Sequence, residues 1–584
     1  MKSLSRRFGN YSREQFRRDM AAGLTVAFVA LPQSMAYALI AGVKPEYGLY
    51  AFIVGAIVGG LAGSSRHLQT GPTNATSIVV ASTLAAYAAS ENFMGLVFLL
   101  GFLAGVFQLG AGLLKLGNLT QFISRSVLTG FIAAAGLLIV VNQLPNLLGL
   151  PRGNSSTIVD GLIHLFVNWE SYHILTLIIG LGTMLLALLI RQISPKTAAG
   201  VPLLPAFLIA ILAAAGAAAL FQLDQKGVKI IGDIAVSLPP PSLPWFEWKF
   251  LAELAPGAMA IALIGFAEST SASKTVAAVT GDVLDADREF TGQGLAKIAA
   301  AFLSGIPVSG SLTRTVLNYR AGAATKLANA IAGLALALMV LFLGPATAYI
   351  PLAALAGIVV LIAASMVDVE YIKLALRSTR RDPLALGATF AAALFFPLDT
   401  AIYIGVGISL ALFLRRVRVP HLAEMDYEPA AGFRELPADR PPSIPELAIV
   451  QVSGEIFFGG VDLLEEEIKK ITRRPGLKVL ILRLKRAFSL DASSIVALTN
   501  IHNDLVRQGK LLLISGVTGE TEKLFRRCGF EALVGREHIF TARQALFQST
   551  LEALDYAVKY INIHFGKNYP LSRPGSSRPG GSRQ

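Results

Sequence analysis

The stretch GIPVSGSLTRTVLN (305–318) decides how this chain is interpreted. Arg314 stands in it among small hydroxyl residues, between the apolar runs LAKIAAAFL and ANAIAGLALALMVLFLG. A charge placed between such runs is costly in a bilayer and usually serves a function. The stretch therefore predicts a polar site inside an apolar domain.

The composition is typical of a membrane protein. The 584 residues are 53% hydrophobic and only 15% charged, and the mean hydropathy is +0.58. Lys and Arg flank apolar segments, so the net charge of +13 fits a membrane surface better than nucleic acid. The single cysteine, Cys528, allows no intrachain disulfide, and the seven histidines show no spacing typical of metal ligands.

Apolar segments long enough to cross a membrane fall into two groups of seven. The first group is expected at 22–42, 47–63, 73–90, 95–114, 121–148, 172–190 and 200–222. The second is expected at 254–275, 291–305, 310–319, 323–343, 346–366, 384–396 and 398–414. An odd number in each group inverts the second group relative to the first, as in inverted-repeat transporters.

The charges of the loops predict that both termini face the cytoplasm, because the basic residues gather on that side. A multi-pass protein of the plasma (inner) membrane is expected. The predicted parts are a cytoplasmic N-terminal segment (1–20), a transmembrane transport domain (21–416), a linker (417–444), a cytoplasmic domain (445–560) and a disordered tail (561–584). In the cytoplasmic domain, 448–454, 479–484 and 511–516 read as strands between helix-like stretches, which indicates a small α/β domain.

Two expected spans are short and polar, and they occupy corresponding places in the two halves. One contains GPTNATSIVV (71–80) and the other contains SGSLTRTVLN (309–318). A helix that begins inside the membrane directs unpaired N–H groups and a partial positive charge at one point. Two such ends would form an anion site, whereas the alternative is a pair of kinked helices packed through small residues.

These motifs resemble those of the SulP family of anion transporters, the sulfate permeases, over nearly the whole chain. The matching stretches are LPQSMAYALIAGVKPEYGLYAF (31–52), GSSRHLQTGPTNATS (63–77), GFAESTSASK (265–274) and GIPVSGSLTRTVLNYRAGAATKLANAI (305–331). SLDASSIVALTNIH (489–502) resembles the central loop and helix of a STAS domain. The resemblance implies a core of spans 1–4 and 8–11, a gate of spans 5–7 and 12–14, and in many members a homodimer.

The resemblance also assigns an anion-facing edge. Arg314 would raise the positive potential there, unless it is only a packing arginine at a helix end. The N–H groups and hydroxyls at the anion would come from Ser311, Leu312 and Thr313 and, in the other half, from Thr73 and Asn74. The family often has an apolar or aromatic residue where this chain has Thr73, so a more polar cavity is expected.

Gln33 and Tyr37 lie four residues apart on one helical face of the first span. The Gln33 amide can donate to an anion and the Tyr37 ring can shape the pocket. The alternatives are an interhelical hydrogen bond for Gln33 and lipid or core contact for Tyr37. The resemblance favours the site for both.

Glu268 is the acid of interest, since it lies in the apolar stretch PGAMAIALIGFAESTSAS. Desolvation favours the neutral form of a carboxyl, so Glu268 is expected to carry a proton with the anion. It could instead bind Na⁺ with the hydroxyls of Thr270 and Ser271, or form a structural ion pair with Arg314. In the STAS-like part, Ser493 stands where STAS anti-sigma-factor antagonists, which this loop resembles, have a phosphorylatable serine, although a helix cap explains the loop better.

Together these features predict a secondary active anion transporter of elevator type, proton-coupled, for sulfate, bicarbonate or dicarboxylates, and not an enzyme. A Na⁺-coupled bicarbonate symporter and an anion exchanger are alternatives. A nucleobase–cation symporter would need a second acid where this chain has Arg314, and would lack the STAS-like tail. A membrane-anchored STAS regulatory protein is the alternative of another class. No cofactor is expected beyond H⁺ or Na⁺, and the partners would be the anion, the lipid bilayer, a second copy and a cytoplasmic partner of the STAS domain.

Overall fold

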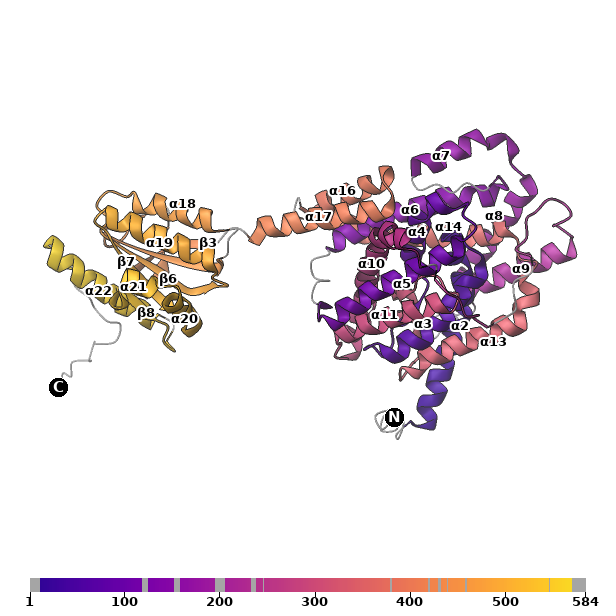
Figure 1. The fold of residues 1–584 in the computed structure, drawn as a ribbon, viewed down its shortest axis with the longest axis horizontal. Helices are drawn as coiled ribbons and strands as arrows, with labels where there is room; N and C mark the ends of the chain where they lie inside the picture. The colour runs from indigo at the N-terminus through magenta and orange to yellow at the C-terminus, as the bar shows by residue number, and fades with distance from the viewer. Residues whose placement is uncertain are drawn as a thin grey trace, which may run out of the picture. The chain divides into compact units, whose positions relative to one another are not determined.

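The computed structural model has two compact units, Met1–Leu410 and Ala411–Gln584 (Figure 1). It describes residues 11–117, 124–151, 158–194, 205–232, 238–244, 246–378, 381–417, 421–428, 432–437, 440–456, 460–545 and 547–569.

The first half of the membrane unit is helical apart from one short strand. Its elements are α2 (Arg13–Ile40), α3 (Pro45–Ala62), β1 (Gln69–Gly71), α4 (Asn74–Thr83), η1 (Ala85–Tyr87), α5 (Phe93–Leu113), α6 (Arg125–Leu148), α7 (Ile158–Val167), η3 (Trp169–Ser171), α8 (Ile174–Ile193) and α9 (Ala206–Leu220). The helix α2 begins earlier than expected, because Ser12 and Gln15 form a capping box ahead of it. The expected cytoplasmic segment 1–20 is therefore partly helix, and residues 1–10 lie outside the described part.

The second half follows the same plan. Its elements are α10 (Trp248–Thr280), α11 (Ala286–Phe302), β2 (Ser309–Ser311), α12 (Leu312–Arg320), α13 (Leu327–Thr347), α14 (Leu352–Met366), α15 (Val369–Arg377), α16 (Arg381–Phe395) and α17 (Leu398–Val417). Each expected span coincides with one of these helices, and the short α4 and α12 are third in their halves. The additional helices α7 and α15 were not predicted, and they also occupy corresponding places. The seven-plus-seven repeat is thereby confirmed.

The membrane helices pack as two groups. In the first, α3 packs against α11 and α13, α5 against α10 and α11, and α2 against α13; α3, α5 and α11 lie side by side in Figure 1. In the second, α6 packs against α14 and α16, and α8 against α9 and α14. We call the groups the core domain (α2–α5 and α10–α13) and the gate domain (α6, α8, α9, α14, α16 and α17), as the sequence predicted.

The second unit is built on a six-stranded sheet of order β4-β3-β5-β6-β7-β8. Its strands are β3 (His421–Glu428), β4 (Gly432–Glu435), β5 (Leu447–Glu455), β6 (Val479–Phe488), β7 (Leu511–Val517) and β8 (Ile539–Thr541). The strands β5 to β8 run parallel, and β3 pairs antiparallel with β4 and β5. Since β5, β6 and β7 are the three expected strands, the α/β prediction is confirmed.

Helices cover both faces of this sheet. They are α18 (Val461–Thr472), α19 (Ala492–Arg507), α20 (Gly519–Arg527), α21 (Phe530–Val534), η4 (Arg536–His538) and α22 (Gln548–Phe565). The helices α18 and α19 lie on one face and α22 on the other, because successive strand residues alternate between two apolar clusters (Figure 1).

Two boundaries of this unit differ from the prediction. The segment expected to be a linker, 417–444, holds β3 and β4, which extend the sheet. The helix α22 continues to Phe565, past the point where we expected the tail to begin, because its apolar face is buried on the sheet. Residues 570–584 of the expected tail lie outside the described part.

Candidate functional site

The two short helices begin side by side in the core domain. The strands that precede them, β1 and β2, pair antiparallel in the register Gln69↔Ser311, Thr70↔Gly310 and Gly71↔Ser309. Thr73 caps α4, its hydroxyl accepting from the Thr76 amide at 3.4 Å, and Ser311 caps α12 by accepting from the Arg314 amide at 3.4 Å. The remaining unpaired N–H groups of both helices therefore point into one region.

A glycine lets this ribbon approach α10 closely. A Cβ at Gly310 would lie 2.9 Å from the Cα of Ser269, which leaves no room for any other residue. The Gly310 amide donates to the Ser269 hydroxyl at 3.2 Å. The contact places the ribbon directly beside the turn of α10 that carries Glu268.

The N-termini of α4 and α12 open on a cavity of about 1110 Å³ between the core and gate domains. The core domain contributes most of the polar lining, which includes Gln33, Tyr37, Thr73, Asn74, Glu268, Ser311 and Thr313, together with Thr25, Leu312 and Arg320. The gate domain contributes a mostly apolar wall, which includes Ile132, Phe207, Leu208, Ile362 and Met366, with Ser365 and Arg191 as its polar members. Nearly every group able to hold an anion thus belongs to the core domain.

The predicted residues of the first span lie on this wall. Gln33 and Tyr37 are 6% and 7% exposed, and both line the cavity. The amide oxygen of Gln33 is buried without a hydrogen-bond partner among the described residues. An amide oxygen only accepts hydrogen bonds, so an anion cannot be its partner, and the part of Gln33 that could donate to a bound anion is its Nε2.

Glu268 also faces the cavity, where its carboxylate accepts a hydrogen bond from the Thr73 hydroxyl at 2.9 Å. The acid is thereby joined to the cap of α4. Thr270 is half-buried and Ser271 is exposed, and neither lines the cavity. The structure does not bring these two hydroxyls to Glu268.

Arg314 is fully buried and lies behind the cavity rather than in its wall. Its Nη2 donates to the Pro72 carbonyl at 2.8 Å, just before α4, and its guanidinium lies 5.5 Å from the centre of the Phe52 ring. Its Nε and Nη1 have no hydrogen-bond partner among the described residues, and no ion pair to Glu268 is formed there. Arg314 therefore bridges the two short helices and acts on the cavity through its electric field.

Several buried charged residues were not singled out from the sequence, and those of the core domain include Asp19, Glu289 and Lys297. The signal for Lys297 was available, because it is a lone charge within the apolar run LAKIAAAFL. Asp19 and Glu289 stand near helix ends, where acids are common, so the sequence around them did not indicate that they are buried.

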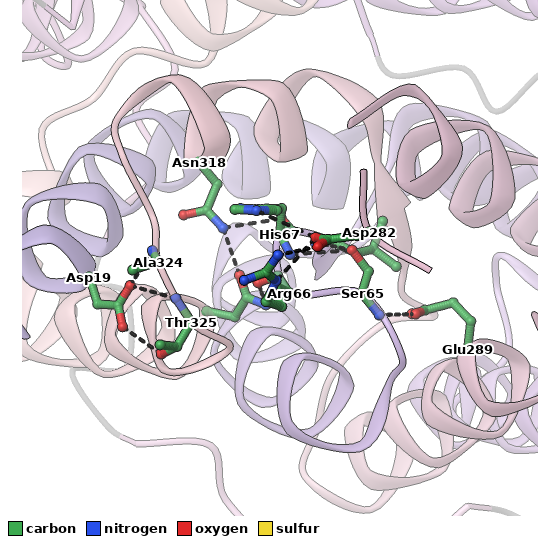
Figure 2. A network of polar contacts seen from close by, with 11 residues as sticks. Asp19, Ser65, Arg66, His67, Asp282, Glu289, Asn318, Ala324 and Thr325 are labelled. Atoms are coloured by element: carbon green, nitrogen blue, oxygen red, sulfur yellow. Dashed lines mark hydrogen bonds and ion pairs between the residues drawn. The ribbon is translucent and has the colours of Figure 1, made fainter. Parts of the chain in front are cut away.

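The two acids, together with Asp282, fasten the loops at the ends of the core helices (Figure 2). Glu289 on α11 accepts from the amides of Ser64 and Ser65 at 2.8 Å each. Asp19 on α2 accepts from the Ala324 and Thr325 amides at 2.6 and 3.0 Å. These bonds hold the chain just before β1 and just before α13.

Asp282 follows α10 and pairs with Arg66, which precedes β1 (Figure 2). The hydrogen bond from Arg66 lowers the pKa of Asp282 below its ordinary value. The pair connects the α3–β1 and α10–α11 loops, so it contributes to holding the core domain together as one body.

In the second unit, the predicted regulatory residue Ser493 lies half-buried in the first turn of α19. Asp491 caps this helix and accepts from the Ser494 amide at 2.9 Å. Ser494 is fully buried and its hydroxyl donates to the Ile456 carbonyl at 2.7 Å. The cap expected as the structural alternative is present, and phosphorylation of Ser493 stays a prediction.

Comparison with known proteins places this site in a family. Residues 16–389 match the model of the sulfate permease family, and 438–546 match the STAS domain. The putative sulfate transporter YvdB of Bacillus subtilis (strain 168) is 30% identical over 544 residues, which are 92% of this chain and 98% of that protein. The probable sulfate transporter Rv1739c of Mycobacterium tuberculosis (strain ATCC 25618 / H37Rv) is 31% identical over 547 residues, 91% of this chain and 95% of that one.

Solved structures show the same fold. The murine Slc26a9 anion transporter in the inward-facing state superposes with a TM-score of 0.83 at 19% identity, covering 94% of this chain and 92% of that one. The transmembrane domain of the cyanobacterium bicarbonate transporter BicA gives a TM-score of 0.59 at 22% identity, covering 68% of this chain and 98% of that one. The chain is a multi-pass membrane protein, an anion transporter and not an enzyme, and it belongs to the sulfate permease family with a C-terminal STAS domain.

Proposed function

We propose that this protein is a secondary active transporter that carries an oxyanion together with a proton. The observation that supports this most is the convergence of three features on one cavity: the N-termini of α4 and α12, and the carboxyl of Glu268. Helix N-termini favour an anion, and a carboxyl beside it can take up the accompanying proton. Relatives of similar length are named sulfate transporters, so we take sulfate as the first substrate to test.

A proton fits Glu268 better than Na⁺. A sodium ion needs several oxygen ligands, and the hydroxyls expected to supply them, on Thr270 and Ser271, do not line the cavity. The hydroxyl that reaches Glu268 is that of Thr73, which also caps α4. A Na⁺-coupled bicarbonate symporter and an exchanger remain the alternatives that uptake measurements would separate.

We propose further that the core domain carries the anion past the gate domain in an elevator-type movement. The polar lining belongs almost entirely to the core domain, while the gate domain offers a mostly apolar wall. A site carried on one body can move without breaking its own hydrogen bonds, and an apolar wall resists its sliding least. The proposal extends to a plasma-membrane location with both termini cytoplasmic, on the basis of the loop charges, and to a homodimer, which the resemblance to the family implies.

Uptake of labelled sulfate, bicarbonate and fumarate into liposomes that contain the full chain tests this function. We expect accumulation of sulfate when the outside is acidic, and no response to a Na⁺ gradient. Glu268→Gln should abolish accumulation driven by the proton gradient while exchange of internal for external anion continues. Proton-driven accumulation that persists in this variant would remove Glu268 from coupling, and uptake of none of the three anions by the wild type would contradict the proposed function.

A further inference from the structure

Lys297 is a fully buried lysine at the centre of the core domain. It lies on α11, and its ammonium donates to the amide oxygen of Gln108 on α5 at 2.5 Å. A Cβ at Gly265 on α10 would lie only 3.0 Å from the Lys297 nitrogen. Since Gly265 precedes Glu268 by three residues, the ammonium lies against α10 one turn away from that acid.

The partner of Lys297 does not neutralise it. Gln108 is an uncharged amide, its own Nε2 has no hydrogen-bond partner in the described part of the chain, and no ion pair of Lys297 is found there. A buried ammonium with a neutral partner costs stability, and an ionisable residue at such a position indicates a function. Because Lys297 does not line the cavity, that function acts through its field and not through contact with an anion.

The charged and titratable side chains that act on Glu268 come from three elements packed around it. They are Lys297 on α11, Arg314 on α12 and, through its own interaction with the acid, Tyr37 on α2. Taken by themselves, Lys297, Arg314 and Glu268 carry one net positive charge when Glu268 is ionised and two when it is protonated, and Arg191 and Arg320 in the cavity lining add the same charge in both states. In a medium of low dielectric constant, a bound anion that balances this charge is strongly favoured.

We propose that Lys297 sets the valence of the transported anion, so that the protonated site takes a divalent oxyanion. The inference rests on the proposed function and adds to it a residue that determines specificity from outside the cavity wall. Without Lys297 the protonated site has one positive charge fewer, which shifts its preference toward a monovalent anion. The Gln108 amide positions the ammonium and leaves its charge intact.

The test compares two oxyanions of different valence, sulfate and nitrate, as competitors of labelled sulfate uptake into liposomes at acidic external pH. For Lys297→Met we expect the preference for sulfate over nitrate to fall at least tenfold, whereas Lys297→Arg should retain it. A Lys297→Met protein that transports with an unchanged ratio would overturn the inference. Failure of the wild type to take up either ion would instead count against the proposed substrate class, so the two failures are distinguishable.

A second pair of variants serves if Lys297→Met does not fold. Gln108→Glu places a carboxylate beside the ammonium and cancels its charge in place, so it should lower the sulfate-to-nitrate ratio as Lys297→Met does. Gln108→Leu removes the same hydrogen bond without adding charge and should leave the ratio near that of the wild type. Equal sulfate-to-nitrate ratios for Gln108→Glu and Gln108→Leu would overturn the inference. Both variants remove the hydrogen bond to Lys297, and only Gln108→Glu also adds a negative charge beside it.

Discussion

The helices α4 and α12 occupy the same place in the two halves, yet they divide the chemistry of the site between them. Each follows a short strand of one ribbon and is capped by a hydroxyl residue, Thr73 in one case and Ser311 in the other. The cap of α4 also donates to the acid Glu268, whereas α12 carries the buried cation Arg314. A symmetric backbone thus holds an asymmetric pair of groups, an acid that we propose to take up the proton and a cation that we propose to favour the anion.

If the two helices divide the functions in this way, one arginine is enough. Arg314 reaches from α12 to the carbonyl of Pro72, at the start of α4, so its charge lies between the two N-termini. The partial charges of both helix ends add to it at the cavity. A second arginine on α4 would raise the cost of burial and would lie close to Glu268, whose proton it would displace.

The largest effect is expected from Arg314→Met, which removes the cation from the α12 side. The affinity for sulfate should fall about a hundredfold, since a preorganised cationic group contributes about 3 kcal/mol to holding an anion in a dry site. Thermal stability should stay the same or rise, because a buried guanidinium with unpartnered nitrogens is replaced by an apolar chain of similar length.

Sulfate binding and thermal unfolding of the purified protein measure the two effects of Arg314→Met separately. Lys274→Met is the matched control, because Lys274 is an exposed cation on α10 that does not line the cavity. If Arg314→Met lowered stability and affinity together, Arg314 would be a structural bridge and the asymmetry between the helices would lose its basis.

A smaller effect on sulfate binding is expected from removing either cap hydroxyl, in Thr73→Val or in Ser311→Ala. Each removes a hydroxyl that accepts from a helix amide, which costs about 1 kcal/mol of stability, and the affinity for sulfate should fall less than in Arg314→Met. Only Thr73→Val also removes the hydrogen-bond donor of Glu268, so only this variant should move the pH profile of uptake, toward higher pH. KM for sulfate measured across pH checks both statements.

Thr73→Ser keeps the hydroxyl and serves as the control for the cap variants, with the wild-type pH profile expected. An equal shift of the pH profile of uptake in Thr73→Val and Ser311→Ala would show that both helices act on Glu268. The proposed division of the proton and anion functions between α4 and α12 would then be wrong.

The sequence predicted the two half-helices because their signals are local. Hydroxyl caps, Gly and Pro before them, and short polar stretches in apolar surroundings can all be read within about ten residues. The pairing of β1 with β2 could not be predicted, since it joins residues 69–71 to 309–311 and depends on the packing of the whole core domain. The same holds for the position of Arg314, whose partner Pro72 is remote in sequence.

There are also physical reasons why the sequence analysis did not identify the role of Lys297 or the strand β3. Lys297 was visible as a lone charge, but its place beside α10 follows from how α11 packs, which periodicity does not reveal. In the STAS unit, β3 reads as a polar segment because most of its side chains are only half-buried, and a Pro-rich stretch follows it. The structure places Gln33, Tyr37, Thr73, Asn74, Glu268, Ser311, Leu312 and Thr313 around one cavity, and their roles stay predictions until transport is measured.

The smallest effect on transport is expected from variants in the loops that join the two halves, away from the cavity. The pair of Arg66 and Asp282 connects the loop before β1 to the loop after α10, and the Arg66 side chain is 51% exposed. A partly exposed pair contributes about 0.5 kcal/mol, so Arg66→Gln, Asp282→Asn and the double variant should give a coupling of that size. Transport should change less than twofold, because the short helices keep their caps and Glu289 still holds the backbone before β1.

The pH dependence of this coupling has a definite sign. Arg66 lowers the pKa of Asp282 in the folded protein, so the stabilisation is fully present above the ordinary aspartate pKa and disappears only as the pH falls through the lowered value. Thermal unfolding at neutral pH and near pH 3 should therefore show the coupling at the first and a reduced coupling at the second. The exposed pair of Lys470 and Glu466 on α18, 3.3 Å apart, is the control, and its coupling should be smaller than that of Arg66 and Asp282. A coupling of Arg66 and Asp282 above about 2 kcal/mol, with loss of transport, would mean that the loops and not the helix caps set the geometry of the two N-termini.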